Sequence, residues 1–116
     1  MNDTVGQNMN IDRAKEIADF QTQVAELANR LSVRGVAIEK IEYQAEVFGC
    51  WGFVAGTKEK KFDFSYDGKD STLMFHDTAI VPKDYRDVQQ RRFRTQDRED
   101  PLAYVGDFLA REFPLK

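Results

Sequence analysis

The spacing of apolar residues changes from three or four to two near residue 40, and this change constrains the fold more than any other feature of the chain. The first pattern places its apolar side chains on one face of an α-helix. Its members are Ile17, Phe20, Val24, Leu27 and Leu31. The second pattern is typical of a strand with one buried face. Its members are Ile41, Tyr43, Ala45, Val47, Gly49, Trp51 and Phe53.

The boundaries of the first helix are marked by residues that favour helix ends. Asn10 is a residue type that caps helix N-termini, and Gly35 tolerates the left-handed conformation that ends a helix. Residues 1–9 are therefore predicted to form a flexible lead-in, and residues 10–116 a single domain. A chain of 116 residues is too short to divide into two pieces with a core each.

Further strands are predicted after the first one. A straight strand from residue 41 to residue 55 would be too long for this domain, so we expect a bend or reversal at Gly49–Gly52. Phe62, Phe64 and Tyr66 then alternate with polar residues. The segment 67–70 contains Gly68 and indicates a hairpin turn. The sequence therefore predicts three or four antiparallel strands in a meander.

The C-terminal third of the chain contains two predicted helices. Tyr85, Val88 and Phe93 fit a short helix over residues 83–94. Asp100-Pro101 is a capping carboxylate followed by a proline at the first helical position, and Phe113-Pro114 ends this last helix. The predicted fold is α+β, with an N-terminal helix, the meander and a C-terminal helix, and with the helices on one face of the sheet.

Composition limits the classes of function. The formal charge of −3 gives no general attraction to polyanions, and one cysteine allows no intrachain disulfide. No apolar run approaches the length of a spanning helix, and the polar N-terminus does not resemble a secretory signal. We expect a cytoplasmic protein without a cofactor or a metal and without a membrane as partner.

Catalysis is an alternative that depends on Cys50 or His76. The stretch Phe48–Phe53 resembles the segment around the nucleophilic cysteine of papain-like proteases, which implies a thiol activated by a histidine. Its period-two alternation favours a strand, and a buried structural cysteine explains it more simply. A small hydrolase or transferase that uses Cys50 or His76 remains an alternative, and the sequence favours a protein that is not an enzyme.

Nucleic-acid binding is a second alternative, because arginines gather between residues 86 and 98. Five arginines against two aspartates give this segment a local charge of +3, with Phe93 among them. Arginine beside an aromatic ring suits phosphate and base contacts. Over residues 83–100, six positive residues against five negative ones leave only +1, which is typical of a solvated surface with local ion pairs.

The leading prediction is a non-catalytic protein-interaction or regulatory module, in the form of a homodimer joined through its sheet or bound to another protein. Eight of the 14 aromatic residues lie on predicted strands, and two short helices would leave part of that surface uncovered. The predicted interaction surface comprises Trp51, Phe53, Arg91, Arg92, Phe93 and Arg94.

Overall fold

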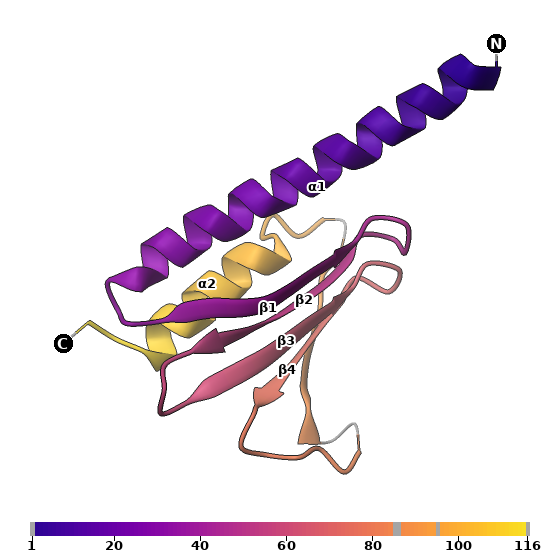
Figure 1. Ribbon diagram of the computed structural model, residues 1–116. Helices are drawn as coiled ribbons and strands as arrows, with labels where there is room; N and C mark the ends of the chain where they lie inside the picture. The colour runs from indigo at the N-terminus through magenta and orange to yellow at the C-terminus, as the bar shows by residue number, and fades with distance from the viewer. Residues whose placement is uncertain (1, 85–86, 95, 116) are drawn as a thin grey trace.

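A five-stranded antiparallel sheet with both helices on one of its faces forms the molecule (Figure 1). The computed structural model describes residues 2–84, 87–94 and 96–115, with side chains from residue 12 onward. The elements are α1 (Asn2–Ser32), β1 (Ala37–Gln44), β2 (Cys50–Gly56), β3 (Lys61–Asp67), β4 (Thr72–Asp77), β5 (Gln89–Arg92) and α2 (Pro101–Glu112). The strands follow one another in chain order across the sheet, so the predicted α+β meander is confirmed, with one strand more than expected.

Helix α1 is longer than its apolar pattern predicts. It begins at Asn2, so Asn10 lies inside the helix and does not cap it. The predicted stop is confirmed, because Gly35 has a φ of 76°. The amide of Gly35 donates to the carbonyl of Ser32, and that of Val36 to the carbonyl of Leu31, which is the Schellman arrangement. That residues 1–9 form a flexible lead-in stays a prediction.

The two hairpin turns at one end of the sheet lie against each other (Figure 1). The chain reverses between β1 and β2 through residues 45–49, where Phe48 and Gly49 have positive φ values of 55° and 68°. In the turn between β3 and β4 the positive φ belongs to Ser71, not to Gly68 as the sequence suggests. Gly68 is needed for another reason. A Cβ atom there would lie 1.8 Å from the carbonyl oxygen of Phe48.

The helix predicted over residues 83–94 is wrong across the described part of that segment. Gln89–Arg92 forms strand β5, which pairs with β4, while residues 85 and 86 lie outside the described residues. The apolar residue that follows the strand explains the difference. Phe93 is 7% exposed and packs edge-to-face on Tyr66 and Tyr104, so the sheet buries a side chain that an isolated helix would leave in water.

The aromatic residues of the sheet lie on the face that the helices cover. Of the eight on which the interaction prediction rests, only Phe48 is exposed, at 67%. The others are Tyr43, Trp51, Phe53, Phe62, Phe64, Tyr66 and Phe75, of which Tyr43 and Tyr66 are half-buried and the rest are buried. The expectation that two helices leave the aromatic sheet surface uncovered is therefore wrong, because α1 is long and α2 carries its own apolar stripe.

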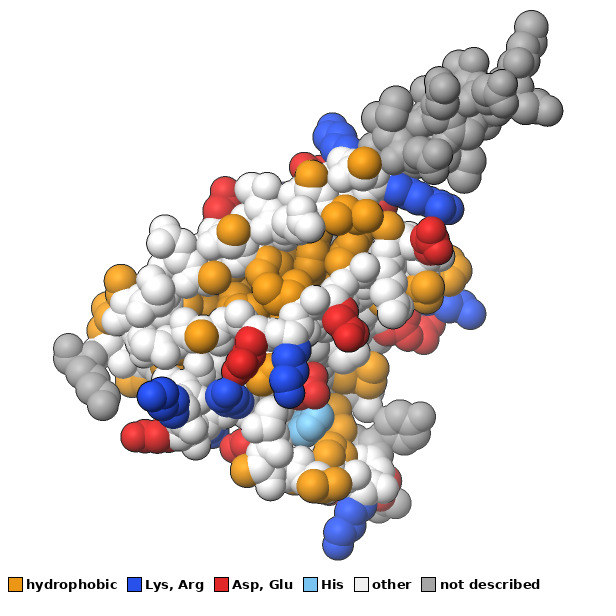
Figure 2. Space-filling model, in the orientation of Figure 1, with side chains coloured by type: hydrophobic (Ala, Val, Ile, Leu, Met, Phe, Trp, Pro, Cys, Tyr) orange, Lys and Arg blue, Asp and Glu red, His pale blue; other side chains and the backbone are white. Residues whose placement is uncertain are grey.

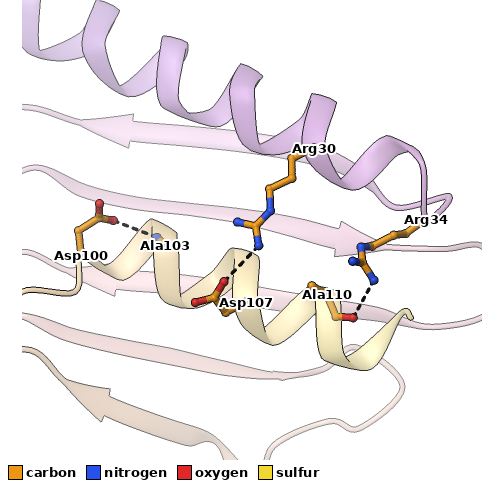
Figure 3. A network of polar contacts seen from close by, with 6 residues as sticks. All are labelled: Arg30, Arg34, Asp100, Ala103, Asp107 and Ala110. Atoms are coloured by element: carbon orange, nitrogen blue, oxygen red, sulfur yellow. Dashed lines mark hydrogen bonds and ion pairs between the residues drawn. The ribbon is translucent and has the colours of Figure 1, made fainter. Parts of the chain in front are cut away.

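Polar contacts hold the two helices parallel to each other (Figure 3). Arg30 forms an ion pair with Asp107 at 3.1 Å, and Arg34 donates to the carbonyls of Ala110 and Phe113 at 3.0 and 3.1 Å. The guanidinium of Arg34 thereby satisfies carbonyls that the end of α2 leaves unpaired. At the other end, Asp100 accepts a hydrogen bond from the amide of Ala103, so the predicted cap and start of α2 are confirmed.

Candidate interaction site where helix α1 leaves the sheet

The sheet face away from the helices is mainly polar and carries few large apolar side chains. Because side chains alternate between the two faces of a sheet, every second residue of β2, β3 and β4 points to this face, and most of these residues are small or polar. The large apolar ones among them are Val54 and Met74. Other residues of these strands on the same face are Cys50, Gly52, Asp63, Ser65 and His76. Figure 2, which views this face, shows the apolar side chains gathered instead along the line between α1 and the sheet.

Glu16 on α1 and Tyr43 on β1 form the centre of the candidate site. The hydroxyl of Tyr43 donates a short hydrogen bond to the carboxylate of Glu16 and so joins the helix to the sheet edge. Gly49, at the end of the β1–β2 turn, leaves room for this pair, because a Cβ atom there would lie 3.2 Å from both oxygens. Two hollows adjoin the pair, and both include Tyr43 in their walls.

The first hollow, which we call the outer groove, lies between α1 and the β1–β2 turn. It has a volume of about 590 Å³. Its walls are formed by Arg13, Ala14, Ile17, Tyr43, Gln44, Ala45, Glu46 and Val47. Arg13 and Glu46 form an exposed ion pair across it at 3.4 Å. Two of its apolar side chains, Ile17 and Val47, are among the exposed large hydrophobic residues of the described chain.

The second hollow, which we call the inner cleft, lies between α1, the start of α2 and the helix-covered face of the sheet. It has a volume of about 300 Å³. Its walls are formed by Glu16, Asp19, Phe20, Gln23, Tyr43, Gly49, Trp51, Tyr66, Asp100, Pro101 and Leu102. Two stacked ring pairs line it, Tyr43 with Phe20 at 4.5 Å and Trp51 with Tyr66 at 5.3 Å between centroids, and a tilted contact of Phe20 with Trp51 at 6.0 Å joins them. The cleft therefore has an aromatic floor and a carboxylate rim.

The pKa of Tyr43 is raised above its ordinary value of 10.0. Burial of the ring is the main cause, because it disfavours the phenolate. The hydrogen bond to Glu16 and the negative charge of that carboxylate act in the same direction. The Tyr43 hydroxyl is therefore a structural donor at neutral pH, and it is not a base.

Phe48 stands out in the turn beside the outer groove. Its side chain is 67% exposed, and its backbone has a φ of 55°, a conformation that bulky residues rarely adopt. Neither burial nor an easy backbone conformation accounts for phenylalanine at this position. Such strain in an exposed aromatic residue is typical of a binding surface.

The predicted interaction surface is divided by the fold. Trp51, Phe53 and Phe93 lie in the core, although Trp51 also lines the inner cleft and Phe93 lines a hollow beside the β3–β4 turn. Arg91 packs over the rings of Phe93 and Tyr104, at 4.9 and 4.7 Å from their centroids.

Arg91 also pairs with Glu99 at 3.0 Å, so it is largely engaged within the fold. The exposed Arg92 and Arg94 line a separate hollow with Lys69. That these two arginines contact a partner stays a prediction. Phe93 lies in the wall of the same hollow but is only 7% exposed, so little of its ring is open to the base stacking on which the nucleic-acid alternative relied.

The structure does not bring Cys50 and His76 together. Cys50 lies beside Asp67, and Asp67 pairs with Thr72 on β4. His76 is four residues farther along β4, which separates it from the position of Cys50 by about 13 Å along the strand direction. The Cys50 sulfur accepts a hydrogen bond from the amide of Gly68 at 3.4 Å and lies 3.9 Å from the Asp67 carboxylate.

Asp77, which follows His76 in the sequence, does not orient the imidazole of His76. It pairs with Asp63 across the sheet, and alternation places Asp77 on the opposite face. A Cys–His pair is not assembled among the described residues.

Sequence reasoning missed the residues that build the two hollows. Glu16 and Ile17 lie in a helical pattern, and Tyr43 and Val47 lie in a strand pattern. Each residue was therefore explained by its secondary structure alone, with no sign of a shared site. The Arg13–Glu46 and Glu16–Tyr43 contacts join residues far apart in the chain. The detectable signal was the pair Val47-Phe48, two large apolar residues at a turn, where polar residues are usual.

Comparison with known proteins adds no assignment. No protein-family model, no curated protein and no solved structure matches this chain. Within the described residues, neither helix combines the length and apolar character needed to cross a membrane. The function is therefore argued from the geometry of the chain itself.

Proposed function

We propose that this protein is a non-catalytic interaction module that forms a homodimer through the outer groove and the adjoining β1–β2 turn. One observation carries the proposal. Of the eight large hydrophobic side chains exposed in the described chain, four lie on α1, β1 or this turn. They are Ile17, Ile41, Val47 and Phe48. Exposed apolar residues that gather around a groove typically mark a protein-binding surface.

The position of α1 supports a second chain at this end. The helix starts at Asn2 and continues past the edge of the sheet, next to the outer groove (Figure 1). Helices in proteins gain most of their stability from the packing of one face against other elements. A partner that lies along α1 and the groove would pack on the helix, and it would cover Ile17 and Val47 at the same time.

The charges around the outer groove suit a second copy of the same chain. A two-fold interface places the same surface on both partners, so that surface must complement itself. Arg13 and Glu46 give the groove one positive and one negative side chain, both largely exposed. In a two-fold dimer, each can pair with its opposite on the other copy without leaving a net charge in the contact.

Sedimentation equilibrium of the wild-type chain and of single charge insertions tests this proposal. We expect a dimer that dissociates on dilution. Val47→Glu should raise the dimer dissociation constant about a hundredfold, because it places a charge without a partner in the contact.

Val81→Glu is the matched control. Val81 is 83% exposed and lies in the loop between β4 and β5, away from the groove, so this variant should dimerise like the wild type. A wild-type chain that stays monomeric at all concentrations would overturn the homodimer. Equal weakening by the two glutamate variants would overturn the assignment of the surface.

A cytoplasmic location belongs to the same proposal. The single cysteine, Cys50, allows no intrachain disulfide, which suits a reducing compartment. Recovery of the native protein in the cytosolic fraction of its cells would support this location, and recovery from the secreted fraction would contradict it.

A further inference from the structure

We infer that the inner cleft is a binding site for an organic cation with an aliphatic stem, such as the side chain of arginine or lysine. The cleft shares only Tyr43 with the outer groove among its lining residues, and this inference does not depend on the homodimer. Its volume of about 300 Å³ lies at the lower end of the range for small-molecule sites, which suits a group of this size.

The charge of the cleft selects for a cation. Three carboxylates line it, those of Glu16, Asp19 and Asp100, and its walls contain no lysine, arginine or histidine. The formal charge of the lining is therefore −3, as large as that of the whole chain. Two basic side chains lie in neighbouring hollows, and both are engaged in ion pairs. Arg13, in the outer groove, pairs with Glu46 at 3.4 Å. Arg30, in a hollow between the two helices, pairs with Asp107 at 3.1 Å.

The capping role of Asp100 leaves part of its carboxylate for a ligand. One oxygen accepts from the amide of Ala103, and the other oxygen of a carboxylate has its own acceptor sites. The N-terminus of α2 opposes a cation through its dipole, so Asp19 and Glu16 are needed as well. The three groups come from α1 and from the start of α2, which places them around the mouth of the cleft.

The spacing of the carboxylates suits a larger cation better than a metal ion. A bound Ca²⁺ needs six to eight oxygen ligands within about 2.6 Å. In the described part of the chain, no three acidic, histidine or cysteine side chains are close enough to hold a metal ion together. A larger cation with several donors, such as a guanidinium group, is able to reach carboxylates that are farther apart.

The floor of the cleft selects for an aliphatic stem. Tyr43, Phe20, Trp51 and Tyr66 line it through successive ring contacts, and Leu102 adds an apolar side chain from α2. Arginine and lysine side chains pack their methylene groups on apolar surfaces and keep the charged end at a polar rim. In the cleft, the aromatic rings would contact the methylene groups and the carboxylates would contact the charged end.

Titration with a blocked arginine, N-acetylarginine methylamide, tests the inference. The indole N–H resonance of Trp51, the only tryptophan of the chain, serves as the reporter. The titration is made on the wild type and on Val47→Glu, so that self-association neither produces nor hides the result. We expect a saturable shift in both proteins that weakens as salt is added.

Three further comparisons make the outcome decisive. The corresponding citrulline derivative is neutral and almost the same shape, so it should bind about tenfold more weakly or not at all. The double variant Asp19→Asn/Asp100→Asn should weaken arginine binding about tenfold, and asparagine keeps the helix cap. Glu59→Gln, which removes an exposed carboxylate from the β2–β3 turn, should leave binding unchanged.

Free arginine and agmatine distinguish the sources of the cation. Tighter binding of the blocked arginine than of free arginine would assign the site to a protein side chain, because the blocked form has the neutral amides of a peptide in place of the charged α-ammonium and α-carboxylate groups. Tightest binding of agmatine would assign it to a small free amine. No shift with any of these cations, equal binding of citrulline, or an undiminished affinity in the folded double variant would overturn the inference.

Discussion

At the scale of single residues, a close backbone contact joins the two hairpin turns at one end of the sheet. The carbonyl of Phe48 lies so near the α-carbon of Gly68 that no side chain fits between them. Gly68 is therefore required by space, not by its φ angle. This contact fixes the β1–β2 turn against the β3–β4 turn and thereby sets where Val47 and Phe48 are exposed.

Gly68→Ala should lower the free energy of unfolding by about 1–3 kcal/mol, because the new methyl group forces the two turns apart. Denaturant unfolding measures this change. Phe48→Ala should change the stability little, since the side chain is exposed, and it should not rescue Gly68→Ala, because the clash involves a backbone oxygen. Rescue by Phe48→Ala would show that the turns are arranged differently.

The raised pKa of Tyr43 predicts that the free energy of unfolding decreases at alkaline pH as this tyrosine ionises in the unfolded chain. The folded chain holds the phenolic proton at pH values where the unfolded chain, with a pKa near 10.0, has lost it. The contribution of this residue is therefore complete below pH 10 and declines as the pH rises above it. Tyr43→Phe should be about 1 kcal/mol less stable at neutral pH, because Glu16 loses its donor.

Spectrophotometric titration of the four tyrosines measures the ionisation directly. The wild type should show one tyrosine that ionises later than the ordinary range, and Tyr43→Phe should lack it. A late-ionising tyrosine that persists in the variant would contradict the assignment.

At the scale of elements, strand β5 places one of its two arginines in the fold and the other on the surface. Arg91 points to the helix side, where it packs on two rings and pairs with Glu99. Arg92, the next residue, is exposed and lines the hollow beside the β3–β4 turn. The alternation of a strand separates a structural arginine from a surface arginine.

Arg91→Ala should lower the free energy of unfolding by about 1–2 kcal/mol, since it removes both the ring contacts and the ion pair of a half-buried side chain. Arg92→Ala should change it by less than about 0.5 kcal/mol. Urea unfolding of the two variants side by side measures the difference. Equal effects would contradict the placement of β5 in the sheet.

The limits of prediction from sequence also lie at this scale. The period of apolar residues identified α1 and the strands, and Asp100-Pro101 identified the start of α2, because these signals are local. Strand β5 carries the sequence Gln-Gln-Arg-Arg, which has no apolar alternation, so only its pairing with β4 makes it a strand. The two hollows depend on contacts between α1 and the β1–β2 turn that no local pattern contains.

At the scale of the whole molecule, the shape is set by α1. The chain measures 57 × 33 × 27 Å, and the long dimension follows the helix beyond the sheet (Figure 1). The helices bury the aromatic face of the sheet, and half of the large apolar side chains that stay exposed in the described chain lie on α1, β1 or the β1–β2 turn. A homodimer through this end would cover the outer groove, the turn and the neighbouring part of α1 together.

The measurement that tests this account most directly is sedimentation equilibrium of Phe48→Asn beside the wild type. Asparagine tolerates a φ of 55°, so the variant keeps the turn and loses only the exposed ring. We predict a folded chain whose dimer dissociation constant is at least about tenfold higher than that of the wild type. An unchanged dissociation constant, or a wild type that does not dimerise, would contradict the claim that this end of the molecule is its binding surface.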